Sequence, residues 1–252
     1  MVGRELAGGV TAGLAPYSTV NAIALPLLTA VRERYPSILL HINHNFGGVL
    51  SEAMMTSRMD MALLYDAGPI KGVDFVRLLT EELMVVAPAG TGLPGAAGTA
   101  VSIKELVDLP LLLPGPMHTI RKVVEQAYEY AFEQARVVGE VESVTLMAQV
   151  VRNGLGASVL PLSVARRIMN VENLELRRSE PTIEVQVSLG TPSNHAVQAG
   201  RAVREVLRTV VPGPAPISRS TTNRVLRLRP IRLPSFSASF RESPHLKLRR
   251  LR

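Results

Sequence analysis

The sequence predicts an α/β fold of two Rossmann-like lobes joined by two crossover strands. Strand-like and helix-like segments alternate from residue 8 to about residue 211, which is typical of layered α/β proteins. Two long extended stretches, 73–88 and 182–190, divide this alternation into two units. A chain of 252 residues is long enough for one large domain or two small lobes with a real core.

The first unit has three apolar strand-like segments separated by two helices. In the first helix, Ile23, Leu27 and Val31 recur at every fourth position, and Pro36 stops the helix soon after. The β-α-β-α-β order favours a parallel sheet with right-handed crossovers. The expected elements are a strand over 8–14, a helix over 18–34, a strand over 38–42, a helix over 47–58 and a strand over 59–65.

The second unit repeats the alternation after a loop rich in glycine, alanine and proline. Ser102 and Glu105 fit a capping box for a short helix, and Ser143 fits the N-cap of a helix that ends at Asn153. The other expected elements are strands over 110–114, 137–142 and 157–161, an apolar-striped helix from His118, and a final helix over 194–210. We therefore expect lobe I over 1–80 and 190–211, and lobe II over 81–189.

Composition excludes several classes of protein. The chain has no cysteine, so disulfides, thiolate metal sites and cysteine nucleophiles are excluded. Its five histidines show no zinc-binding spacing, and no stretch is apolar enough to span a membrane. The start lacks the basic-then-apolar order of a signal peptide, so we expect a cytoplasmic protein without membrane contact.

The net charge of +7 belongs to the end of the chain. Ten of the 28 Lys and Arg residues but only one of the 21 acidic residues lie in 212–252, so this tail carries +9 and the rest −2. We expect the tail to be disordered, either as a basic arm for nucleic acid or as non-native sequence from a frameshift or extended reading frame. We favour the second interpretation, because the bases are not regularly interleaved with aromatic residues as a stacking platform would need.

No catalytic motif is visible. The sequence lacks a G-x-S-x-G elbow, a phosphate-binding loop and a G-x-G-x-x-G turn that opens a helix. Most acidic residues fall on expected solvent faces. We therefore expect no enzyme activity, no cofactor and no metal.

Two turns of the first unit are candidate binding sites. Tyr17, Ser18 and Thr19 connect the first strand to its helix, where free N–H groups and the helix dipole attract anions. The glycines of the segment 45–48 would let a ligand approach the backbone at the second helix. An ordinary N-cap and a plain tight turn are the alternative interpretations.

The segment "LPGPMHTIR" (113–121) places polar side chains at a helix start in the second unit. His118 and Thr119 fall near the N-cap, and Arg121 falls in the first turn. A positive charge is unfavourable at this end of a helix, so a counter-anion would offset its cost. Arg121 offers a planar fork for a carboxylate, and the alternative is that both charged side chains point into water.

The order of segments resembles the effector-binding domain of LysR-type transcriptional regulators over roughly residues 3–211. The segments that carry the resemblance are "GGVTAGLAPYS", "LPLLTAVRERYPSILLHI", "FGGVLSEAMMTSRMDMALLYD", "LLTEELMVVAP" and "MAQVVRNGLGASVLPLSVA". The resemblance implies a fold like that of type 2 periplasmic binding proteins. It also implies a small-molecule site in the cleft between the lobes.

The nitrogen-assimilation-control subgroup is the most similar one, through its Leu-Pro-x-x-x-His-x-Leu-Arg segment. Leu113, Pro114, His118 and Arg121 match this segment. Two features depart from the subgroup: Tyr17 replaces a usual Ser or Thr, and Gly115-Pro116 replaces a typical Ser-Arg pair. The residues expected to bind an anionic effector are Tyr17, Ser18, Thr19, Asn45, Gly47, Gly48, Tyr65, His118, Thr119, Arg121, Ser143 and Thr145.

The resemblance further implies a homodimer or tetramer whose effector domains pair antiparallel. Regulators of this family carry an N-terminal winged helix-turn-helix, whereas this chain begins at the first strand of the effector domain, so we expect no DNA contact in the family manner. The alternatives are an exported solute-binding protein of the same architecture, an enzyme with this fold, and a nonfunctional truncated regulator. The missing signal peptide and catalytic dyad argue against the first two.

Overall fold

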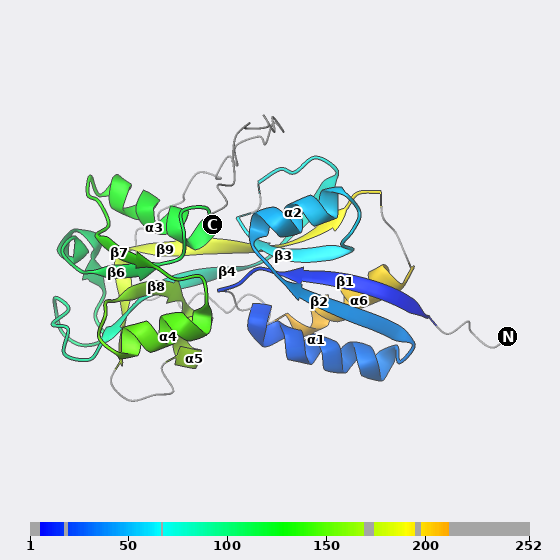
Figure 1. Ribbon diagram of the computed structural model, residues 1–252, viewed down its shortest axis with the longest axis horizontal. Coiled ribbons are helices and arrows are strands. Elements are labelled where there is room, and N and C mark those ends of the chain that lie inside the picture. The colour runs from blue at the N-terminus through cyan, green and yellow to red at the C-terminus, as the bar shows by residue number, and fades with distance from the viewer. Residues whose placement is uncertain (1–5, 18–19, 67, 169–173, 195–197, 212–252) are drawn as a thin grey trace, which may run out of the picture.

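The chain folds around a seven-stranded mixed β-sheet and a separate two-stranded parallel sheet of β6 (Leu111–Leu113) and β7 (Val137–Glu140), in agreement with the predicted α/β class. The computed structural model describes residues 6–17, 20–66, 68–168, 174–194 and 198–211, so the expected disorder of 212–252 lies outside it. The seven-stranded sheet has the order β2-β1-β3-β9-β4-β8, and β5 (Val101–Ser102) pairs with β9 off this path. Helices cover the sheet in two groups, which we call lobe I (β1 to β3 with α1, α2 and α6) and lobe II (β6 to β8 with α3 to α5) (Figure 1).

Lobe I has the predicted β-α-β-α-β order. Its elements are β1 (Gly8–Leu14), α1 (Val20–Arg34), β2 (Ile38–His44), α2 (Gly47–Met55) and β3 (Met61–Tyr65). β1 pairs in parallel with both β2 and β3, and every residue of β3 is buried. α2 ends earlier than predicted, since Ser57 adopts a left-handed conformation (φ 53°) that a helix cannot continue through.

Two long antiparallel strands connect the lobes. β4 (Val73–Pro88) has the predicted bounds, and β9 (Leu174–Pro192) begins eight residues before the predicted stretch. The sequence hid this first part of β9 because charged residues replace the apolar alternation of a strand. Arg177 is one of them, yet it is 2% exposed and donates to the carbonyls of Pro94 and Thr99 at 2.7 Å each.

Lobe II follows the prediction with one missed helix and one missed strand. Ser143 caps α4 by accepting a hydrogen bond from Leu146, and the Ser102 N–H donates to Glu105 as in a capping box. The helix α5 follows β8 without a capping signal, and β5 has two residues, so neither was predicted. The elements are η1 (Ile103–Leu106), β6 (Leu111–Leu113), α3 (Thr119–Tyr130), β7 (Val137–Glu140), α4 (Val144–Arg152), β8 (Ser158–Pro161) and α5 (Leu162–Ile168).

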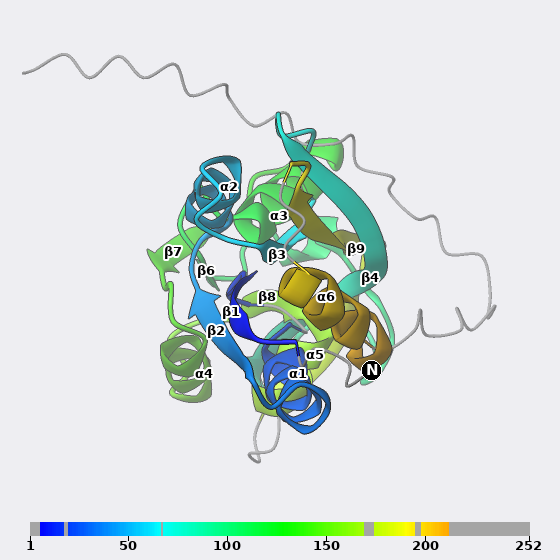
Figure 2. The same ribbon diagram turned by 90° about the vertical axis from the view of Figure 1, so that its right-hand side faces the viewer.

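The final helix α6 (Gln198–Val210) returns to lobe I. It packs against α1 and β1, and the turned view shows α1 and α6 on one face of the sheet with α2 on the opposite side (Figure 2). The expected lobe boundaries near residues 80 and 190 fall inside β4 and β9, which both lobes share, so they stay predictions. No described helix is long and apolar enough to cross a membrane.

Replacing Gly156 by alanine should destabilise lobe II. A Cβ at this position would lie 2.7 Å from the backbone oxygen of Pro110, where hydrogen bonds of 2.8 Å from Ala157 to Pro110 and from Leu112 to Ala157 join β6 to β8. We expect urea denaturation to show a loss of about 1–3 kcal/mol for Gly156→Ala. Gly9→Ala, with nothing within 4 Å, is the control and should change stability by less than about 1 kcal/mol; equal stabilities of the two variants would contradict the clash.

Candidate functional site

Tyr17 connects the two lobes directly. It precedes α1 in lobe I, is fully buried, and donates a hydrogen bond of 2.6 Å from its hydroxyl to the carbonyl of Val141 in lobe II. Burial, with a further contribution from the negative charge of Glu142, raises the pKa of this phenol above its usual value. The hydroxyl is therefore protonated, and able to donate, at neutral pH.

The imidazole of His118 lies next to Tyr17. Its ring meets the Tyr17 ring edge to face at 5.5 Å between centroids, and the Phe46 ring at 6.5 Å. His118 is the N-cap of α3, where its Nδ1 accepts a hydrogen bond of 3.2 Å from Ile120 N–H. Tyr17, which precedes α1, and His118, which caps α3, therefore meet between the lobes.

His118 is uncharged near neutral pH. The side chain is 8% exposed, and burial lowers its pKa from 6.5 to about 4. Because Nδ1 is an acceptor, the single proton of the neutral ring is on Nε2. Within the described residues Nε2 makes no hydrogen bond, so His118 offers one N–H donor where the lobes meet.

Arg121 is held by its own lobe. Its guanidinium forms ion pairs with Glu125 and Glu140 and donates to the carbonyl of Pro114 at 3.3 Å. The side chain is 10% exposed. The counter-anion that the sequence led us to expect at this helix start is thus provided by two protein carboxylates, and binding of an effector by Arg121 stays a prediction.

The side chain of Glu142, which follows β7, contacts the backbone of the turn that precedes His118. The N–H of Gly115 donates to its carboxylate at 3.0 Å, and a Cβ at position 115 would lie 2.6 Å from the same oxygen. A side chain at position 115 would require the flexible Glu142 carboxylate to shift. Glycine at this departure from the subgroup pattern accommodates the contact without that shift, which the sequence could not show without the position of Glu142.

A buried polar network contacts the backbone carbonyl of Tyr17. The Tyr65 hydroxyl donates to either of two acceptors, the Tyr17 carbonyl at 2.8 Å or Glu81 Oε2 at 2.6 Å. Ser163 of α5 donates to the other Glu81 oxygen at 2.7 Å. Since Glu81 is on β4, the network joins lobe I, a crossover strand and lobe II. An acidic residue inside the apolar stretch 78–86 was the available signal for Glu81.

The remaining predicted residues are in the turn that begins α2 and at the starts of α3 and α4, or outside the described residues. The Asn45 side chain accepts a hydrogen bond from Phe46 N–H at 2.9 Å, and a Cβ at Gly47 or Gly48 would meet nothing closer than 3.9 Å. Ser143 and Thr145 are exposed at the start of α4, and Thr119 is half-buried at the start of α3. Ser18 and Thr19 fall outside the described residues.

The structure thus brings Tyr17, Tyr65 and His118 together, along with Phe46, Glu81 and Glu142, which were not predicted as site residues. It does not show contacts of Ser143 or Thr145 with this centre. Among the described residues, no group of three or more His, Asp and Glu side chains could hold a metal ion. The arrangement offers hydrogen bonds and aromatic surface for recognition.

Comparison with known proteins identifies relatives of this chain. Residues 4–212 match the family described as the LysR substrate binding domain. Over 216 residues the chain is 34% identical to the nitrogen assimilation regulatory protein nac of Escherichia coli strain K12, which covers 84% of this chain and 69% of that protein. This agrees with the predicted subgroup.

Solved structures share the fold. The C206 mutant of OxyR from Corynebacterium glutamicum superimposes with a TM-score of 0.71 at 21% identity, over 83% of this chain and 65% of that one. The CcmR regulatory domain of Synechocystis PCC6803, solved in complex with 2-PG, gives 0.70 at 16% identity over 82% and 100%. The fold is the periplasmic-binding-protein-like fold of such regulatory domains, as predicted.

The pH dependence of stability should carry a contribution from His118. Its pKa is lower in the folded than in the unfolded chain, so the unfolded chain binds more protons between about pH 6.5 and pH 4. His118 therefore lowers the free energy of unfolding as the pH falls through this window, by about 3 kcal/mol at most. His118→Asn retains an N-cap oxygen but no titratable ring.

Denaturation of the parent and of His118→Asn at pH 7, 6 and 5 tests this. We expect the parent to lose more stability than the variant at each step downward. The difference between the two proteins removes the opposite contributions of Asp66, Glu82 and Glu184, whose carboxyl pKa values burial raises. Parallel pH profiles would show that His118 titrates normally.

Proposed function

This chain belongs to the LysR substrate-binding domain family, and on that premise we propose that it is the effector-sensing and oligomerisation module of a transcriptional regulator acting in the cytoplasm. The relatives are transcriptional regulators rather than enzymes. A small molecule that binds between the lobes would favour one arrangement of lobes or subunits and so bias attached DNA-binding domains. The chain spans about two thirds of the length of such regulators.

One observation carries the proposal of the binding site: the buried, uncharged His118 with a hydrogen-bond donor between the lobes. The imidazole is mostly buried, but its Nε2–H is not among the fully buried, unsatisfied atoms of the described residues, so the donor is accessible to an acceptor atom of a ligand or of water. Tyr17 and Phe46 flank it with aromatic surface. An acceptor atom of a small molecule satisfies the Nε2–H, and the rings exclude water from that bond.

We propose that the effector is an anion. Support comes from Tyr17 and His118, which precede α1 and cap α3 and meet at this place, because the N-terminal end of a helix carries the positive end of its dipole. Ser18 and Thr19 would contribute hydroxyl donors from lobe I, and His118 an N–H from lobe II. Arg121 would add its charge to the electrostatic attraction even while paired.

We further propose a homodimer as the basic unit. Two edge strands, β2 of lobe I and β7 of lobe II, have exposed apolar side chains on them and on the adjacent helices. These residues are Leu25, Leu28 and Leu39 in lobe I, and Val138, Leu146 and Leu155 in lobe II. Antiparallel pairing of two chains would place each lobe I patch against the lobe II patch of the other, covering both.

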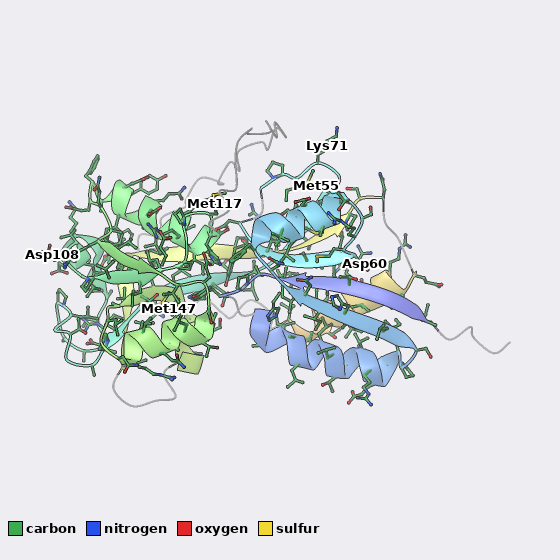
Figure 3. The ribbon with its side chains drawn as sticks, viewed as in Figure 1. Met55, Asp60, Lys71, Asp108, Met117 and Met147 are labelled. Atoms are coloured by element: carbon green, nitrogen blue, oxygen red, sulfur yellow. The ribbon has the colours of Figure 1, made fainter. Side chains whose placement is uncertain are left out.

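Effector binding is tested by a thermal-shift screen of small carboxylates followed by calorimetry of any molecule that stabilises the parent. His118→Asn should weaken binding about tenfold, equivalent to 1.4 kcal/mol, because the shorter amide does not reach the Nε2 position. Arg121→Ala should also weaken it. Lys71→Ala, remote from the junction (Figure 3), is the control. Unchanged affinity of His118→Asn would rule out the assigned site.

The dimer is tested by placing a charge in one patch. Leu39 is 76% exposed on the edge strand β2, so Leu39→Glu should leave the fold of one chain intact while burying a charge in the paired assembly. We expect sedimentation velocity to change from dimer to monomer. Val76→Glu, at an exposed position on β4, is the control and should remain dimeric. A parent that sediments as a monomer at all concentrations would overturn the proposal.

A further inference from the structure

Tyr17 joins the two lobes directly, without an effector. From its backbone conformation, its hydroxyl contact and its burial we infer that Tyr17 is an internal strut: its phenol holds lobe I and lobe II together before a ligand arrives, and its ring limits the effector to molecules that fit beside it. This inference rests on the proposed function only in its statement about effector size. The strut itself concerns the chain alone.

The backbone of Tyr17 is held in an unfavourable conformation. Its φ of 59° lies in the left-handed region, which is unfavourable for a non-glycine residue and persists only where the surroundings hold it. The Tyr65 hydroxyl contributes to that fixation: it shares its one proton between the Tyr17 carbonyl at 2.8 Å and Glu81 Oε2 of β4 at 2.6 Å. Lobe I and the crossover strand thus anchor one end of the residue.

The side chain of Tyr17 is anchored at the other end by lobe II. Its hydroxyl donates to the carbonyl of Val141, 124 residues along the chain, at 2.6 Å. Both partners are buried, Tyr17 at 0% and Val141 at 8% exposure, so separation of the lobes would leave a donor and an acceptor to be solvated again. The bond is thus a direct link between the lobes outside the crossover strands.

The ring of Tyr17 takes up room beside the proposed donor. It stands edge to face with His118 at 5.5 Å, and His118 is the residue whose Nε2–H remains for a ligand. A ligand that reaches His118 must therefore pack beside the phenol or displace it. A smaller side chain at position 17 would leave this place open, so the side chain at position 17 sets the size of the effector.

The experiment measures the distance between lobes without any effector. The absence of cysteine permits spin labels at Met55→Cys on α2 and Asp108→Cys in lobe II, which lie in different lobes (Figure 3). Pulsed double electron–electron resonance on the full chain, diluted with unlabelled chain, compares the parent with Tyr17→Phe and Tyr17→Ala. Tyr17→Phe keeps the ring and loses only the hydroxyl, so it folds even where the smaller residue does not.

Tyr128→Phe is the matched control. Tyr128 is 1% exposed and donates from its hydroxyl to the carbonyl of Leu106 at 3.3 Å, with both residues in lobe II. We expect both Tyr17 variants to give a broader distance distribution than the parent, and Tyr128→Phe to give the parent distribution. Identical distributions for Tyr17→Ala, Tyr17→Phe and the parent would overturn the strut.

A chemical rescue tests whether the phenol itself fills the place. Adding p-cresol to Tyr17→Ala should narrow the distance distribution and raise the melting temperature, because it restores both the ring and the hydroxyl donor. Toluene, which lacks the hydroxyl, should do so less. If p-cresol stabilised the parent as much as it stabilises Tyr17→Ala, it would bind at another site. That result would overturn the inference that the phenol of Tyr17 fills the space between the lobes. Since no effector is present, these outcomes are independent of the effector screen.

Discussion

The antiparallel pairing of β4 with β9 is the constraint on which the rest of the molecule depends. The two strands run together from Val73 opposite Pro192 to Pro88 opposite Leu174, and both lobes are built on their ends. Each lobe adds its own strands to this pair, β3 on one side and β8 on the other. Contacts between the lobes, including that of Tyr17, are possible only because this ladder fixes how far apart and at what angle the lobes lie.

Most charges near the junction are already satisfied by the protein. Arg121 is paired with Glu125 and Glu140, and Glu142 fills the turn at Gly115. What remains for a ligand is a neutral donor on His118 between aromatic rings, since burial removes the charge of the imidazole. Recognition here would depend on shape and on one directed hydrogen bond more than on a free ion pair.

The same side chains that bind a ligand in the proposed function also hold the lobes. Tyr17 contacts lobe II, and its carbonyl contacts the network of Tyr65, Glu81 and Ser163. A ligand that alters the position of Tyr17 would therefore act on the crossover strand and on α5 at once. This gives a physical route from a binding event to the relative arrangement of the lobes.

The sequence by itself determined the local elements, because hydrophobic periodicity, caps and breakers act within a few residues. It predicted the βαβ order of lobe I, the bounds of β4, the Ser143 cap and the helix start at His118. It did not reveal the first half of β9, where Arg177 is buried by the loop 94–99, or the pairing of Arg121 with Glu140 and of Gly115 with Glu142. Those features depend on residues far apart in the chain that only the tertiary structure brings into contact.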